Sequence, residues 1–191
     1  MYERALEVID QITTDTTVKS IINSTNKRQT QSKLWLVKEA RPYLEMIPEP
    51  NICVMAGWYG HLASLLCEFT SRPVISVDMD KSCQEIGRKL QKGKNIKFRV
   101  KTMEEWEPVG YNVNVCTSCE HIPQKQIDDY LKRTLSGTLK ILQSNNYYKI
   151  EEHINCRESL DDFVKDYNPE KLLFKGELDL EEYKRFMIIF V

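Results

Sequence analysis

Residues 51–82 read NICVMAGWYGHLASLLCEFTSRPVISVDMDKS, and this stretch contains the pattern that decides the fold. It opens with a short apolar run at 52–55, which is typical of a strand buried on both faces of a sheet. The turn AGWYG at 56–60 interrupts that run, and apolar residues then recur at helical spacing. A second apolar run, at 74–77, ends on Asp78. This order predicts a strand, a glycine turn, a helix and a second strand that delivers an acid.

The same unit has the spacing of a nucleoside-binding site. Asp78 follows Gly57 by 21 residues, close to the roughly 20 expected between a dinucleotide-type turn and its ribose-binding acid. Free N–H groups at the start of the helix can bind a polar ligand, and a carboxylate can accept bonds from two ribose hydroxyls. The alternative is a packed βαβ unit whose glycines serve only the turn. We favour the nucleoside site.

Three segments are similar to motifs of the class I S-adenosylmethionine-dependent methyltransferases. Cys53–Gly60 resembles motif I of that family, Val74–Asp78 resembles motif II, and Tyr111–Pro123 resembles motif IV. The resemblance covers roughly residues 50–191, by the order of elements as much as by motif. Small proteins of tailed bacteriophages carry a similar AGWYG turn together with QSNNY and HINC segments, and the chain resembles these most.

Motif I departs from the family pattern of an acid followed by three alternating glycines. Val54 holds the acidic position, and Ala56 and Trp58 replace glycines. The departure bears on cofactor affinity more than on the fold, because the strand and helix patterns on both sides of the turn are intact.

The resemblance implies an α/β fold, a three-layer Rossmann-like sandwich. Its sheet would be mostly parallel and seven-stranded with an antiparallel C-terminal strand, and N-terminal helices would be added to it. Residues 1–48 would form a helical extension packed on a methyltransferase domain at 49–191. The implied cofactor is S-adenosylmethionine, with S-adenosylhomocysteine as product. The residues expected to bind it are Ala56, Gly57, Trp58, Tyr59, Gly60, Asp78, Met79, Thr102, Met103, Cys116 and Lys33.

Candidate catalytic residues follow the fourth predicted strand, because α/β sheets bind ligands outside the carboxyl ends of their parallel strands. Glu120 and His121 lie there, and either can act as a general base when its surroundings hold its pKa near neutrality. His153 follows a further predicted strand on the same side. The alternative is that Glu120 and His121 only join strand to helix. The segment lacks the Pro-Pro-aromatic run of DNA amine methyltransferases, which disfavours that activity.

Composition narrows the remaining possibilities. The chain has 191 residues, a formal net charge of −1, and no strong nucleic-acid signature. No apolar run approaches the roughly 20 residues of a membrane span. Six cysteines without a signal peptide predict a reduced, cytoplasmic protein, in the host cytoplasm if a phage encodes it. Cys116 and Cys119 have no second Cys-x-x-Cys pair, so we predict no metal. The sequence does not decide whether the protein is a homo-oligomer.

The remaining elements are predicted from hydrophobic periodicity. We expect two short helices within residues 1–22, interrupted at Thr13–Thr17, then a polar loop or lid at 23–32 and a helix at 33–47 that Pro42 kinks or breaks. Farther on, the patterns predict helices at 81–90, 127–142 and 159–167, and strands at 96–100, 112–115, 147–151, 171–178 and 184–191.

Three functions fit these observations. The first is a methyltransferase that acts on an unidentified small-molecule or macromolecular acceptor. The second is a noncatalytic S-adenosylmethionine-binding or interaction protein that retains the fold. The third is an enzyme that uses the cofactor for another reaction. A fold alone does not separate them, because function depends on the site.

Overall fold

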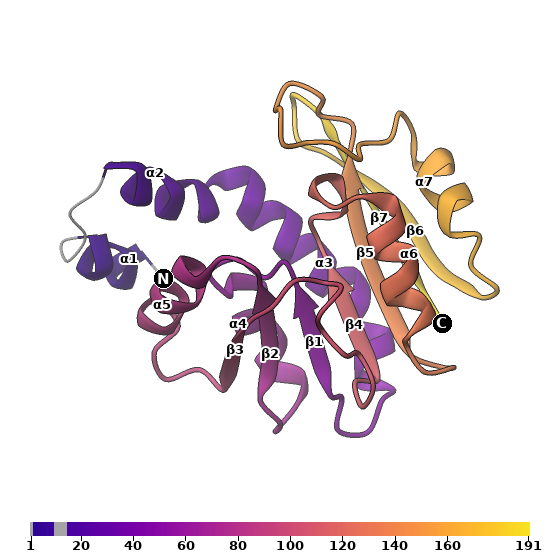
Figure 1. Cartoon of the computed structure of the whole chain (residues 1–191), viewed down its shortest axis with the longest axis horizontal. Helices are drawn as coiled ribbons and strands as arrows, with labels where there is room; N and C mark the ends of the chain where they lie inside the picture. Colours follow the sequence, from indigo (N-terminus) through magenta and orange to yellow (C-terminus); the bar gives the residue numbers. More distant parts are fainter. Residues whose placement is uncertain (1, 10–14) are drawn as a thin grey trace.

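The computed structural model describes residues 2–9 and 15–191. Within them, seven strands form one sheet in the order β3-β2-β1-β4-β5-β7-β6 (Figure 1). Strands β1 to β5 pair in parallel, whereas β7 is antiparallel to β5 and β6. This arrangement confirms the predicted fold class. The strands are β1 (Ile52–Met55), β2 (Val74–Asp78), β3 (Ile96–Val100), β4 (Val113–Cys116), β5 (Leu139–Asn145), β6 (Leu172–Asp179) and β7 (Lys184–Phe190).

Helices cover both faces of the sheet, so the central strands are buried on both sides. The longer helices are α1 (Tyr2–Ile9), α2 (Asp15–Ser24), α3 (Lys27–Glu45), α4 (His61–Leu66), α5 (Lys81–Leu90), α6 (Gln124–Lys132) and α7 (Leu160–Tyr167), and short 3-10 turns lie at Cys67–Phe69 and Cys119–His121. Ile52 and Val54 pack in the core beneath α3 and α4, whereas Cys53 and Met55 pack toward α6 and α7. Alternate residues of β1 therefore enter different cores, as the two-residue period of a strand requires.

The N-terminal helices pack on the sheet domain in two places. Helix α1 contacts α5 at the β3 end of the sheet (Figure 1), and Ile21 of α2 shares a small core with Tyr59 and Ile86. Leu36 and Leu44 of α3 belong to the main core itself. The proposed domain boundary at residue 48 stays a prediction. Part of the predicted break at Thr13–Thr17 lies outside the described residues.

The prediction of a polar loop or lid at 23–32 is wrong, because most of this segment is helical in the structure. Helix α2 continues to Ser24, and α3 begins at Lys27 after Asn26, whose side chain accepts a hydrogen bond from the Gln29 N–H. Such a cap satisfies a free N–H of the first turn, so a polar sequence can start a helix. Helix α3 also continues through Pro42, which is exposed, where water can satisfy the freed carbonyl group.

The prediction of a long helix at 127–142 is wrong for the second half of that region. Helix α6 ends at Lys132, and β5 starts at Leu139 after a turn in which Gly137 has a φ of 78°. Leucines at 131, 135, 139 and 142 imitate helical spacing, but β5 is buried on both faces and so gives no alternation to reveal a strand. The strand predicted at 147–151 is consequently wrong, and that segment forms a turn.

Among the described residues, no helix combines the length and the apolar character needed to cross a bilayer.

Candidate functional site

A first cleft of about 290 Å³ lies at the carboxyl ends of β1, β2 and β3. Five predicted cofactor-binding residues line it: Ala56, Asp78, Met79, Thr102 and Met103. His121, from the turn after β4, closes one side. The prediction missed Lys101, Glu104 and Gln126, which also line this cleft. Lys101 and Glu104 flank Thr102 and Met103 in sequence, and this position next to predicted site residues was the signal that could have identified them. Parallel strands therefore bring residues spread over some 70 positions to one edge.

Asp78 is fixed at the edge of the first cleft by backbone donors. Its Oδ2 accepts a hydrogen bond from the Trp58 N–H at 2.8 Å, and its Oδ1 accepts one from the Asp80 N–H at 3.1 Å. Burial raises the pKa of Asp78, and these backbone donors oppose that rise. A carboxylate has about four acceptor positions, so Asp78 retains acceptor capacity for a ligand's hydroxyl groups.

The AGWYG loop keeps the geometry of a glycine turn without glycines at two positions. Ala56 and Trp58 both have a φ of 49°, a left-handed conformation that costs a non-glycine residue roughly 1–2 kcal/mol. Gly57 lies against β2: its N–H donates to the Val77 carbonyl at 2.9 Å, and a Cβ there would stand 2.2 Å from Ser76 Oγ. Gly57 is thus required by the packing of the turn on the sheet.

Several predicted cofactor-binding residues lie outside the first cleft. Tyr59 is buried and donates its hydroxyl to Ser20 Oγ at 2.9 Å, and Gly60 forms the left-handed cap of α4. Cys116 is buried at the end of β4. Lys33 lines a small separate cavity beside His61. The structure therefore brings together the residues that follow strands, and it separates from them most of the glycine loop and Lys33.

A second cleft, of about 310 Å³, adjoins the first and is formed by distant parts of the chain. Trp58 and the three candidate catalytic residues, Glu120, His121 and His153, all line it. His121 lines both clefts. The prediction missed further lining residues from α3, β5, β7 and the segments that follow or precede those strands, among them Arg28, Asn145, Tyr147, Tyr183 and Arg185.

His121 and His153 lie edge to face in the second cleft, with ring centroids 4.5 Å apart. His121 Nδ1 is 3.1 Å from the Glu152 carbonyl oxygen, and His153 Nδ1 is 2.6 Å from the Tyr147 carbonyl oxygen. A carbonyl only accepts, so each Nδ1 carries the proton and each neutral ring keeps its lone pair on Nε2. Burial by surrounding atoms lowers the pKa of His121, although its side chain is exposed to the cleft.

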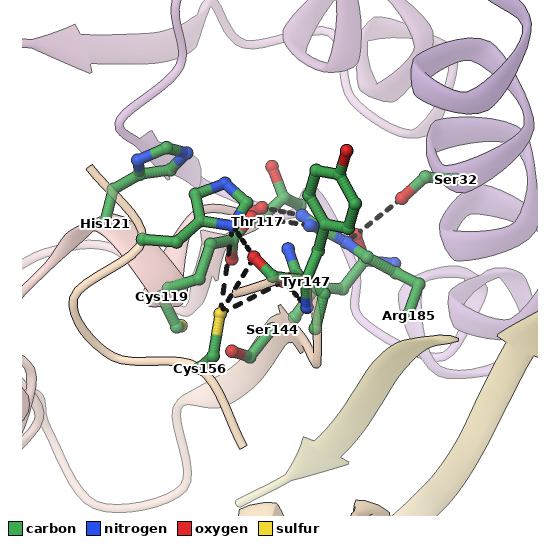
Figure 2. Close-up of polar contacts among 12 residues, drawn as sticks. Ser32, Thr117, Cys119, His121, Ser144, Tyr147, Cys156 and Arg185 are labelled. Atoms are coloured by element: carbon green, nitrogen blue, oxygen red, sulfur yellow. Dashed lines mark hydrogen bonds and ion pairs between the residues drawn. The ribbon is translucent and has the colours of Figure 1, made fainter. Parts of the chain in front are cut away.

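A buried ion pair forms part of the wall of the second cleft. Arg185 Nη1 lies 2.6 Å from Glu120 Oε1, and both side chains are less than a tenth exposed. Arg185 also donates to the Thr117 carbonyl, and Figure 2 draws both residues with their polar contacts. Within the described part of the chain, no donor contacts Glu120 Oε2. The sequence signal for this pair was a lone arginine directly before the apolar run FMIIF of the last strand.

Two further ionisable groups lie under the N-terminal helices. Burial lowers the pKa of Lys33 to about 7, and the nearby charge of Arg185 acts in the same direction. Burial also lowers the pKa of His61 to about 4. The His61 ring lies between Ser24 Oγ at 3.1 Å and Gln91 Nε2 at 3.0 Å. Both His61 nitrogens thus have partners within the fold, which indicates a structural role.

Several solved structures with the same fold are named as methyltransferases. The N-methyltransferase NodS from Bradyrhizobium japonicum, in complex with S-adenosylhomocysteine, has a TM-score of 0.69 and 9% identity over 98% of this chain and 97% of its own. Magnesium protoporphyrin IX methyltransferase from Synechocystis with bound S-adenosylmethionine has a TM-score of 0.62 and 14% identity, covering 100% and 91%. An S-adenosylmethionine-dependent methyltransferase from Anabaena variabilis has a TM-score of 0.63 and 20% identity, over 83% of this chain and 83% of its own.

No protein-family model matches the sequence, and no curated protein is similar to it. The likeness to the solved structures therefore establishes the methyltransferase fold, at identities between 9% and 20% for these three neighbours.

Proposed function

We propose that this protein is an S-adenosylmethionine-dependent methyltransferase that binds its cofactor in the first cleft and its methyl acceptor in the second. The observation that carries the proposal is the position of His121, which lines both clefts and so marks where they meet. A methyltransferase needs two adjoining sites with a shared boundary, because the methyl group passes directly from cofactor to acceptor. The fold of the structural neighbours supports the same function.

The residues of the first cleft fit S-adenosylmethionine. Asp78 offers a fixed carboxylate with acceptor capacity for ribose hydroxyls. Met103 is buried beside Thr102 at the end of β3, where an apolar side chain and a hydroxyl can contact a purine base. The cofactor supplies a methyl group already activated as a sulfonium, so the protein has mainly to position the acceptor and exclude water.

The second cleft has the character of an acceptor site with polar and aromatic walls. The Tyr147 and Tyr183 rings lie at a tilt of 37° with their centroids 5.0 Å apart, and Arg28 from α3 also lines this cleft. The two tyrosine rings can stack on a planar molecule, and their hydroxyl groups can donate hydrogen bonds to it. The acceptor is a small molecule or an accessible group of a macromolecule, and the noncatalytic binding protein is the alternative that the following experiment tests.

The proposal is tested by calorimetric titration with S-adenosylmethionine and S-adenosylhomocysteine. Asp78→Asn removes the charge yet keeps an oxygen acceptor, and we expect it to weaken binding at least about tenfold, equivalent to about 1.4 kcal/mol. Asp80→Asn is the matched control: Asp80 caps α5 through the Ser82 N–H and does not line the cleft. Equal affinity in both variants would place the cofactor elsewhere. Absence of binding by the unmodified protein would favour a noncatalytic role.

None of the three neighbours named above is described as a phage protein, so phage origin rests on the AGWYG, QSNNY and HINC segments alone. The cytoplasmic location, in a host cell if phage-encoded, rests on the cysteine content. The sequence has no strong nucleic-acid signature, and it leaves homo-oligomerisation open.

A further inference from the structure

We propose that Glu120, His121 and His153 bind a divalent first-row transition metal ion, of which Zn²⁺ is the probe. One ring nitrogen of each histidine and one carboxylate oxygen of Glu120 all lie within 4.8 Å of one another. The three residues come from the turn after β4 and from the segment after β5, so two separate chain segments converge here. From the sequence we predict no metal, because Cys116 and Cys119 lack a second Cys-x-x-Cys pair.

Each histidine presents the atom that a metal requires. Both Nδ1 atoms face backbone carbonyls, those of Glu152 and Tyr147, and this leaves each Nε2 with its lone pair. Metal-binding histidines typically donate their other nitrogen to a carbonyl or carboxylate, which fixes the ring and its tautomer. The hydrogen bonds of both rings thus already match those of a ligand.

Glu120 gives evidence for the metal site that does not depend on the two histidines. Its side chain is 4% exposed, its Oε1 is paired with Arg185, and its Oε2 has no donor among the described residues. A buried carboxylate oxygen without a partner is costly. A cation between Oε2 and the two Nε2 atoms would satisfy it, while Arg185 would fix the other oxygen as an outer partner.

The ligand set indicates the class of ion. Two imidazoles and one carboxylate favour Zn²⁺, Fe²⁺ or a similar ion over Mg²⁺, which prefers oxygen ligands. A tetrahedral ion with bonds of about 2.1 Å keeps its ligands about 3.4 Å apart. The side chains would therefore have to approach by up to about 1.4 Å, and the exposed His121 side chain has room for such a shift.

The proposed site opens into the second cleft, which all three residues line. An acceptor with an oxygen or nitrogen donor can complete the coordination of the ion there. That consequence rests on the proposed function, whereas metal binding itself does not. In this arrangement His121 and His153 are ligands, and their Nε2 atoms are not available as general bases.

Metal binding is tested on chelator-treated protein, without S-adenosylmethionine, by calorimetric titration with Zn²⁺. We expect one ion per chain, and a loss of affinity of at least about 100-fold in His121→Ala and in His153→Ala. The control is Cys156→Ser, which removes a thiol 3.8 Å from His153 Nδ1 and should retain Zn²⁺ affinity. Excess Mg²⁺ should not displace the ion.

A second readout separates lost ligands from lost folding. Zn²⁺ should raise the Tm of the unmodified protein and of Cys156→Ser but not that of His121→Ala, whose exposed ring can be removed without opening the core. No Zn²⁺ binding, binding that survives both histidine changes, or binding lost in Cys156→Ser would each overturn the proposal. Cofactor binding is measured separately, so failure here leaves the proposed function standing.

Discussion

The first cleft is lined mainly by residues that follow three parallel strands, whereas the second takes side chains from α2 and α3 through to β7. Asp78 in the first is fixed by the backbone N–H groups of Asp80 and of Trp58, which both belong to the same βαβ unit. Glu120 in the second depends on Arg185, 65 positions away in sequence. The first cleft is therefore a local product of strand and turn, and the second depends on buried charges that tertiary packing must bring together.

The largest expected effect is a loss of stability on removing the buried ion pair of the second cleft. Arg185→Met should lower the free energy of unfolding by about 3–5 kcal/mol, because it leaves the Glu120 carboxylate buried without its partner. Urea unfolding measures the change. The control is Lys27→Ala, which removes an ion pair with Glu181 whose two side chains are 71% and 75% exposed, and it should cost less than about 1 kcal/mol. A small effect of Arg185→Met would show that the second cleft does not depend on this pair.

A smaller effect concerns Lys33, whose pKa is lowered to about 7 by burial and by the charge of Arg185. Between pH 7 and its ordinary value of 10.5, the unfolded chain binds a proton that the folded protein lacks. Stability should therefore rise with pH across this window, by up to about 1.4 kcal/mol per unit. Lys33→Met should flatten the profile and raise stability at pH 7 by up to about 4 kcal/mol, because the charged lysine then no longer has to lose its proton on folding.

The matched control for Lys33 lies on the same helix. Lys38 has a side chain that is 80% exposed, so Lys38→Met should leave the pH profile unchanged. Urea unfolding at several pH values between 6 and 10 compares the two variants. Parallel profiles for Lys33→Met and the unmodified protein would mean that Lys33 reaches solvent, and the small cavity beside His61 would then contain no buried charge from this residue.

The smallest expected effect on stability concerns the left-handed backbone at Ala56, which lines the first cleft. Ala56→Gly relieves the left-handed backbone at residue 56, a gain of roughly 1–2 kcal/mol that the greater freedom of the unfolded chain offsets by about 0.4–1 kcal/mol. We expect a net stabilisation of up to about 1 kcal/mol in urea unfolding. Ala63→Gly, at a buried helical position in α4, should instead destabilise by about 1 kcal/mol or more. Destabilisation by both would show that the loop is not strained.

The sequence predicted the elements whose patterns are short and bounded by turns. Strands β1, β2 and β3 and helix α5 lie where the periodicity placed them. It failed where a pattern had two interpretations, as at 127–142, where leucines at helical spacing belong in part to the buried strand β5. It also failed at 23–32, where capping by Asn26 made a polar segment helical.

The sequence by itself determined the βαβ unit at 51–82 and the place of Asp78, because strand burial, turn chemistry and helical spacing are local properties. The tertiary structure alone decided that Arg185 pairs with Glu120 and that His121 and His153 meet in one cleft. Hydrophobic periodicity reports which face of an element is buried, but not which distant polar side chain it will meet. That choice depends on strand order and on the compensation of buried charge, which only the folded chain fixes.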